Sequence, residues 1–196
     1  MARSDLYKLI ISRRSTRLFQ QKAVPLKIIK NAINSARVAP SARNLQFIEY
    51  LIINKKELRE RIFPSLRWAG YVAPARNPSL NMRPAFYIII LINKERTDEP
   101  NLRDIGAAAE NILLSLLSFC LGGCWLQSID KQTLHKILKI PSRYEIDSLV
   151  AAGYPAEFPK LEADSKNIKY WLDGNNQLHV PKRPLKDIMH YNKIAS

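Results

Sequence analysis

Cysteine is scarce in this chain of 196 residues, which contains only Cys120 and Cys124. Their spacing in an apolar stretch matches neither a disulfide framework nor a zinc site with four ligands. We expect both to be small buried packing residues in a reducing compartment. The first eight residues lack the apolar core and cleavage site of a signal peptide, and they carry Arg3, Asp5 and Lys8. The sequence therefore predicts a cytoplasmic protein.

Acidic residues are also few, because 17 Asp and Glu stand against 31 Lys and Arg, which gives a net charge of +14 at pH 7. Such an excess usually indicates a polyanionic partner: nucleic acid, anionic lipid or a phosphorylated small molecule. The charge alone does not choose among these three classes.

Long uninterrupted apolar runs are missing as well. The one candidate membrane span, residues 105–126, contains Glu110, Asn111 and the Gly122-Gly123 break, so we expect no membrane partner. Hydrophobic residues make up 46% of the chain, which is enough for a core without disulfides or metal. No repeat, low-complexity tract or linker divides the chain, and we expect one domain over residues 1–196.

Apolar periodicity predicts helices and strands in alternating order. The expected helices are a short one after Asp5 as N-cap, one from Pro25 that stops before Pro40, and others over 55–62, 102–121, 131–138 and 184–191. The expected buried strands cover 47–53, 85–92, 123–126 and 147–152, and a hairpin joins 170–172 to 177–180 through the turn 173–176. This order predicts an α+β or α/β layered domain.

The helix over residues 102–121 is apolar or small on every face after Glu110, so we expect it to be buried on all sides. A domain of this size can rarely surround such a helix alone, which favours a second copy of the chain against it. The alternative is a central helix that is wrapped within the monomer.

Residues 64–84 contain four prolines and several aromatic side chains but little periodicity. A segment of that length inside a compact domain is typical of a lid or a pocket wall. We expect Trp68 and Tyr71 to be its apolar anchors.

A basic cluster follows the first helix. In an extended segment Arg13, Ser15 and Arg17 point to one side and Arg14 to the other, so two guanidinium groups and a hydroxyl could hold one phosphate. Taken alone, the cluster is explained better by a solvated surface run, because such charge runs are common.

A second polar segment, Pro40 to Gln46, directly precedes a predicted buried strand. The side chains of Ser41, Asn44 and Gln46 could form hydrogen bonds to a planar heterocycle, although Pro, Ser and Asn are also ordinary turn residues.

The two segments together, RRSTR and then APSARNLQ about one helix later, resemble the nitroreductase family of FMN-dependent oxidoreductases. The resemblance continues through the Leu121-Gly122-Gly123 end of the long helix, the turn 152–155 and residues 180–185. It implies an α+β fold in which a nitroreductase-like mixed sheet is flanked by helices. It also implies a long buried central helix at a homodimer interface, where two FMN molecules bind.

The resemblance assigns a cofactor-binding role to twelve residues. It implies that Arg13, Ser15 and Arg17 bind the FMN phosphate, ribityl chain or ring edge. Arg14 would contribute a backbone contact or an additional charge, and Lys182 and Arg183 would close on the phosphate. The segment that reaches the flavin from the partner subunit contains Pro40, Ser41, Asn44 and Gln46. Backbone amides near the reactive face come from Gln127 and Ser128.

The implied reaction is ping-pong: NADH or NADPH reduces FMN, and a nitroaromatic, quinone or related small acceptor is then reduced. The flavin carries the chemistry, so no catalytic side chain is required. The three histidines, His135, His179 and His190, lack metal-ligand spacing, and we expect no metal. Arg17 is expected to stabilise negative charge at the pyrimidine end of the reduced flavin.

Two other classes of function remain possible on the sequence. The net charge, together with arginines and aromatic residues around positions 59–83, suggests nucleic-acid binding. No helix-turn-helix, zinc or RNA-binding motif supports this, so we expect no nucleic-acid partner. The other class is a flavin-binding protein without NAD(P)H turnover.

Overall fold

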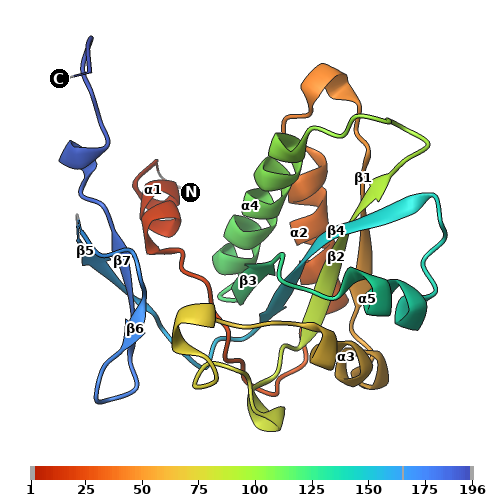
Figure 1. Ribbon diagram of the computed structural model, residues 1–196, viewed down its shortest axis with the longest axis horizontal. Helices are drawn as coiled ribbons and strands as arrows, with labels where there is room; N and C mark the ends of the chain where they lie inside the picture. Colours follow the sequence, from red (N-terminus) through yellow and green to blue (C-terminus); the bar gives the residue numbers. More distant parts are fainter. Residues whose placement is uncertain (1–2, 165, 195–196) are drawn as a thin grey trace.

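The computed structural model describes residues 3–164 and 166–194, and its centre is a four-stranded antiparallel sheet (Figure 1). The strand order is β1 (Ile48–Ile53), β2 (Phe86–Asn93), β4 (Tyr144–Gly153) and β3 (Gly122–Leu126). All eight residues of β2 are buried, because this isoleucine-rich strand lies between β1 and β4 and has helices on both faces. The expected strands are present, but β1 is buried only at Ile53 because it is an edge strand.

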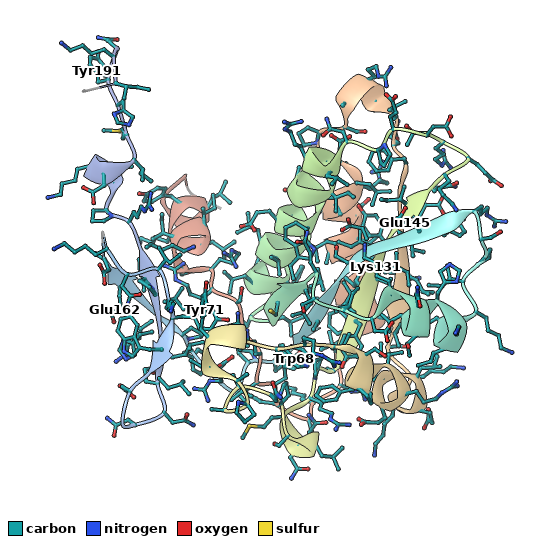
Figure 2. The ribbon with its side chains drawn as sticks, viewed as in Figure 1. Trp68, Tyr71, Lys131, Glu145, Glu162 and Tyr191 are labelled. Atoms are coloured by element: carbon teal, nitrogen blue, oxygen red, sulfur yellow. The ribbon has the colours of Figure 1, made fainter. Side chains whose placement is uncertain are left out.

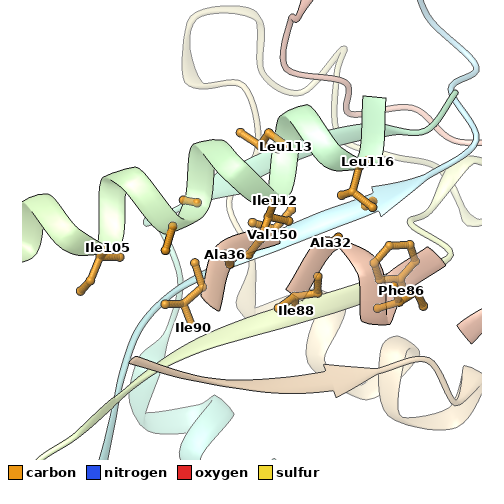
Figure 3. Packing of buried hydrophobic residues seen from close by; sticks show 14 of the residues in the cluster. Ala32, Ala36, Phe86, Ile88, Ile90, Ile105, Ile112, Leu113, Leu116 and Val150 are labelled. Carbon is orange, nitrogen blue, oxygen red and sulfur yellow. The ribbon is translucent and has the colours of Figure 1, made fainter. Parts of the chain in front are cut away.

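Two layers of helices cover the sheet (Figure 1). One face carries α2 (Leu26–Arg37) and α4 (Leu102–Ser118), and the other carries α3 (Lys56–Ile62) and α5 (Lys131–Leu138). Figure 3 shows Ile105, Ile112 and Leu116 of α4 packed over β2 and β4 beside Ala32 and Ala36 of α2. Burial of these apolar stripes on both faces confirms the expected α+β class.

The long helix α4 is shorter than predicted. It begins after Asn101, whose side chain accepts a hydrogen bond from the backbone N–H of Arg103, and it ends at Ser118 instead of Leu121. Cys120 adopts a left-handed backbone with φ of 59°, which breaks the helix before β3. Within one chain α4 is not buried on all sides, because Leu114 and Leu117 are only half-buried.

A smaller three-stranded sheet is formed by β5 (Lys160–Ala163), β7 (Leu178–Lys182) and β6 (Trp171–Leu172). The predicted hairpin is confirmed by the antiparallel pairing of β6 with β7, whereas β5 pairs with β7 in parallel. The helix expected over 184–191 is wrong, because only the single 3-10 turn Leu185–Asp187 forms there.

The helix α1 (Arg3–Ser12) lies between the small sheet and α4 (Figure 1). It begins before Asp5, which therefore stands in its first turn and is not its N-cap. Among the described residues no helix is both long enough and apolar enough to cross a bilayer.

The segment over residues 64–84 follows an irregular course with short 3-10 turns, and it contacts the residues that follow β3. Leu66 forms a bridge with Ile129, and the backbone N–H of Arg67 donates to the carbonyl of Ser128 at 3.0 Å. Trp68 is buried, as expected of an anchor. Tyr71 is 56% exposed, so its expected role as a buried anchor is wrong.

Candidate functional site

The arginine-rich segment leaves α1 and runs beside the edge strand β3. Ser15 forms a parallel bridge with Gly123, and the backbone N–H of Thr16 donates to the carbonyl of Gly123 at 3.0 Å. Thr16 is buried against Gly122, where an added Cβ would lie 2.6 Å from the Thr16 hydroxyl oxygen. A glycine at position 122 therefore permits the close approach that holds this segment in an extended conformation.

A cleft of about 300 Å³ opens beside this segment. Its lining includes Arg13 and Arg14, the apolar side chains of Leu113 and Leu117 of α4, and Pro155, Glu157, Phe158 and Pro159. The cleft therefore combines an apolar surface with convergent cationic groups, which is the usual composition of a site for a small ligand.

The guanidinium group of Arg14 at this cleft is incompletely satisfied, because within the described part of the chain its buried Nε atom has no hydrogen-bond partner. The buried Nε atom of Arg17 is also without a partner there, but Arg17 and Ser15 are not among the residues that line this cleft. Burial lowers the pKa of Arg14, and the charge of Arg13 lowers it further. Unpaired buried donors of a cation cost free energy, so an anion in the cleft would satisfy both the charge and the donors.

The structure places the arginines of this segment differently from the simple alternation. Arg13 forms an ion pair with Glu110 of α4, with 3.0 Å between Nε and Oε1. Arg14, expected to point to the other side, lines the same cleft as Arg13. The Arg17 guanidinium lies over the ring of Tyr170, with 5.2 Å from its Cζ atom to the ring centroid.

Gln127 and Ser128 follow β3 directly. Gln127 stands four residues after Gly123, the residue of β3 that pairs with Ser15. The carbonyls of Gln127 and Ser128 accept hydrogen bonds from the backbone N–H groups of Ile129 and Arg67.

The segment from Pro40 to Gln46 lies at the opposite end of α4. Three of its residues, Arg43, Asn44 and Gln46, have left-handed backbone conformations, and the Ser41 hydroxyl accepts a hydrogen bond from the Gln46 N–H at 3.1 Å. Pro40, Ser41 and Gln46 line a separate cavity of about 350 Å³. Asp104 beside this segment and Leu113 at the arginine cleft are separated by about 14 Å along the helix. One chain therefore does not bring the two predicted halves of the site together.

Lys182 ends β7 and Arg183 follows it, and both side chains are exposed. Neither is among the residues that line the arginine cleft. Their predicted closure on a phosphate is not formed within this chain.

The two cysteines differ in their exposure to solvent. Cys124 is buried, and burial raises the pKa of its thiol, in agreement with a packing role. Cys120 is exposed, so the expectation that it is buried is wrong, because α4 ends before it.

His179 lies between two carboxylates, with Nδ1 at 2.6 Å from Glu162 and Nε2 at 3.2 Å from Asp173. Within the described residues no group of three His, Cys, Asp or Glu side chains is arranged to hold a metal ion.

Two buried charged residues beside the cleft are not among the predicted cofactor-binding residues. Glu157 lines the arginine cleft, and Arg76 comes from the irregular segment over residues 64–84. They form an ion pair, although they stand 81 positions apart (157 − 76) and belong to no recognisable motif. Only the tertiary structure brings them together.

An antiparallel sheet covered by helices on both faces, with an arginine-lined cleft at its edge, defines an α+β domain suited to an anionic ligand. The model of the nitroreductase family matches residues 10–154, and the chain belongs to this family. This membership confirms the resemblance seen in the sequence, and with it the class of oxidoreductases of the nitroreductase type.

Relatives of known name agree with this assignment. An NADH dehydrogenase/NAD(P)H nitroreductase of Archaeoglobus fulgidus is 25% identical over 170 residues, which cover 83% of this chain and 92% of that protein. An iodotyrosine deiodinase of Haliscomenobacter hydrossis is 24% identical over 193 residues, with 83% and 86% covered. The crystal structure of a nitroreductase of Desulfovibrio desulfuricans in complex with FMN superposes with a TM-score of 0.72 at 22% identity, covering 97% of this chain and 98% of that one.

Proposed function

We propose that this protein is an FMN-dependent oxidoreductase that takes electrons from NADH or NADPH and reduces nitroaromatic, quinone or related small acceptors by a ping-pong mechanism. The observation that carries the proposal is the arginine pair at the cleft, with the unsatisfied Nε atom of Arg14 beside the Gly122-Gly123 edge of β3. A phosphate dianion is a ligand that guanidinium groups bind with strong, charge-assisted hydrogen bonds.

The residues around the cleft fit FMN. Arg13 and Arg14 would hold its phosphate, Ser15 and Arg17 its ribityl chain or ring edge, and Leu113 and Leu117 supply an apolar surface. Bound FMN would supply hydride and electron transfer, so the protein needs only to bind, orient and shield it. The positive charge of Arg17 would favour the anionic form of the reduced ring.

A homodimer would complete the site. In the single chain the outer side of α4 is only half-buried, and apolar side chains of α1 are exposed, among them Leu6, Tyr7 and Ile10. The C-terminal arm adds Ile188, Met189 and Tyr191, the last of which lies far from the main sheet (Figure 2). A second copy that covers these surfaces would place its own segment 40–46, and its Lys182 and Arg183, near the cleft of the first. We therefore include these residues in the proposed site as contributions across the interface.

An aromatic pair is suited to planar acceptors. Tyr71, beside the small sheet in Figure 2, packs against Tyr170 with 4.9 Å between ring centroids. Arg17 covers the Tyr170 ring, so this pair adjoins the arginine segment. An exposed aromatic surface next to a cation favours flat acceptors that carry negative charge.

The visible spectrum of the purified protein tests the proposal. We expect flavin absorbance, or its appearance after FMN is added and excess is removed, followed by bleaching when NADH or NADPH is mixed in without oxygen. Re-oxidation by a nitroaromatic or a quinone would complete the cycle. Colourless protein that takes up no FMN contradicts the proposal, and a salt-sensitive shift of DNA by such protein would support nucleic-acid binding instead. Flavin that no nicotinamide bleaches would indicate binding without NAD(P)H turnover.

A further inference from the structure

A buried ion pair joins the irregular segment 64–84 to the cleft. Arg76 is 3% exposed and Glu157 is 8% exposed, and the Arg76 Nε atom lies 3.1 Å from Oε2 of Glu157. Charged side chains are almost never buried to this degree unless they are paired. The ion pair therefore holds both side chains in defined positions.

The other oxygen of Glu157 faces the arginine segment. Its Oε1 atom accepts hydrogen bonds from the backbone N–H groups of Arg17, at 2.5 Å, and of Leu18, at 3.2 Å. One carboxylate thus forms an ion pair with the Arg76 guanidinium, without a hydrogen bond between Nε and Oε2, and its other oxygen accepts hydrogen bonds from two adjacent backbone amides. The position of the Arg17 backbone depends on where this carboxylate is held.

Arg76 also contacts the turn between β6 and β7. Its guanidinium donates to the side-chain oxygen of Asn176 at 3.2 Å and also to the backbone carbonyl of that residue. Asn176 lies in the turn between β6 and β7 with φ of 60°, a left-handed conformation that asparagine tolerates well. Arg76 therefore links the hairpin turn, the exit from β4 and the arginine segment.

We propose that Arg76 is a positioning residue of the flavin site, which acts through Glu157 on the backbone of Arg17 and Leu18. This inference rests on the proposed function, because it assumes that Arg17 contacts FMN. Replacing a buried ion pair by uncharged residues often leaves stability nearly unchanged, whereas the direction that the pair imposes on its neighbours is lost. The effect of Arg76 is therefore expected in FMN affinity more than in folding.

The double variant Arg76→Met/Glu157→Gln tests the inference without leaving a buried unpaired charge. The amide oxygen that this change introduces at position 157 can still accept from the Arg17 N–H, but nothing orients it. We expect FMN to dissociate about tenfold more readily, with an altered visible spectrum of the bound flavin, whereas the melting temperature of the FMN-free protein stays close to that of the wild type. A lower melting temperature with unchanged FMN affinity would show a purely structural pair.

The variant Arg76→Lys gives a second, independent reading. A lysine keeps the charge opposite Glu157 but loses the fork that reaches Asn176, so we expect FMN affinity within about threefold of the wild type. A lysine variant as weak as the double variant would overturn action through Glu157. Arg143→Met, which removes an exposed ion pair with Glu95 elsewhere on the surface, is the matched control and should change nothing.

Arg17→Ala in the same binding assay separates the two proposals. If Arg17→Ala leaves FMN affinity unchanged, the assignment of Arg17 in the proposed function is wrong. If Arg17→Ala weakens binding but the double variant binds as the wild type does, the proposed function stands and the role of Arg76 is refuted.

Discussion

The carboxylate of Asp104 accepts a hydrogen bond of 2.8 Å from the backbone N–H of Ala42. Asp104 is buried in the first turn of α4, and Ala42 lies in the segment from Pro40 to Gln46. The arginine cleft contacts the other half of the same helix through Leu113 and Leu117. The helix α4 therefore sets the separation between the two halves of the proposed site, which in the proposed dimer would come together from different copies of the chain.

Replacement of Asp104 by alanine should loosen the segment from Pro40 to Gln46. The change leaves the N–H of Ala42 without its acceptor, which costs about 1–3 kcal/mol of unfolding free energy. We also expect weaker FMN binding by the dimer, because this segment would no longer be held against the partner's flavin. Chemical denaturation and FMN titration measure the two effects. The exposed Asp98→Ala is the control, and an Asp104→Ala protein that equals it in both assays would contradict the prediction.

Gly122→Ala should displace the arginine segment from β3. The added methyl group would lie 2.6 Å from the Thr16 hydroxyl oxygen and 2.7 Å from its Cβ, closer than real contacts allow. We expect a loss of about 1–3 kcal/mol in stability, typical of overpacking, together with reduced FMN retention during gel filtration. Gly174→Ala has nothing within 4 Å of the new Cβ and should bind FMN as the wild type does.

The main elements of the fold could be predicted because their apolar patterns are local. The eight buried residues of β2 are consecutive in the sequence, and the buried residues of α2 recur at helical spacing. Helix ends were harder to place: α4 ends before the left-handed turn at Cys120, and only a 3-10 turn follows Pro184. Propensity carries little information at such boundaries.

The candidate site was predicted only in part, for a related reason. The extended course of residues 13–17 follows from their sequence, but the ion pair of Arg13 with Glu110 and the place of the half-buried Arg14 in the cleft require the packed helix α4. Arg76 and Glu157 have no sequence signal at all, because their partners come from separate segments. The roles of all these residues toward FMN stay predictions that binding experiments must test.

The exposed apolar face of α1 gives a prediction about assembly. Leu6 is 53% exposed and Ile10 is 44% exposed, and they stand one helical turn apart. The double variant Leu6→Glu/Ile10→Glu should cost a single chain little, but it would bury two charges in a dimer interface and prevent its formation. Sedimentation velocity should show dimers for the wild type and monomers that have lost FMN for the variant. Lys8→Glu, also exposed on α1, controls for the change in charge, and a monomeric wild type would refute the prediction.

The small sheet should lose stability as the pH rises, because of His179. Hydrogen bonds to Glu162, and then to Asp173, raise the pKa of His179, and the imidazole also stacks on Trp171 with 5.1 Å between ring centroids. The contribution of the charged histidine is fully present below about pH 6.5, its unfolded pKa, and is lost as the pH rises through the higher folded value.

The pKa of Asp173 moves in the opposite sense, lowered first by the backbone N–H of Gln177 and then by His179. Its contribution is present above about pH 3.9, the unfolded pKa, and is lost only as the pH falls below that value. Both contributions therefore coexist in mildly acid solution. Melting temperatures measured from about pH 5 to pH 8.5 should show a difference between wild type and His179→Gln that shrinks as the pH rises, since imidazole titrates within this range. The control variant is His190→Gln, which changes an exposed histidine outside the sheet, and its difference in melting temperature from the wild type should stay constant over this pH range. If the difference for His179→Gln were equally constant, the two carboxylates would not hold the proton on His179.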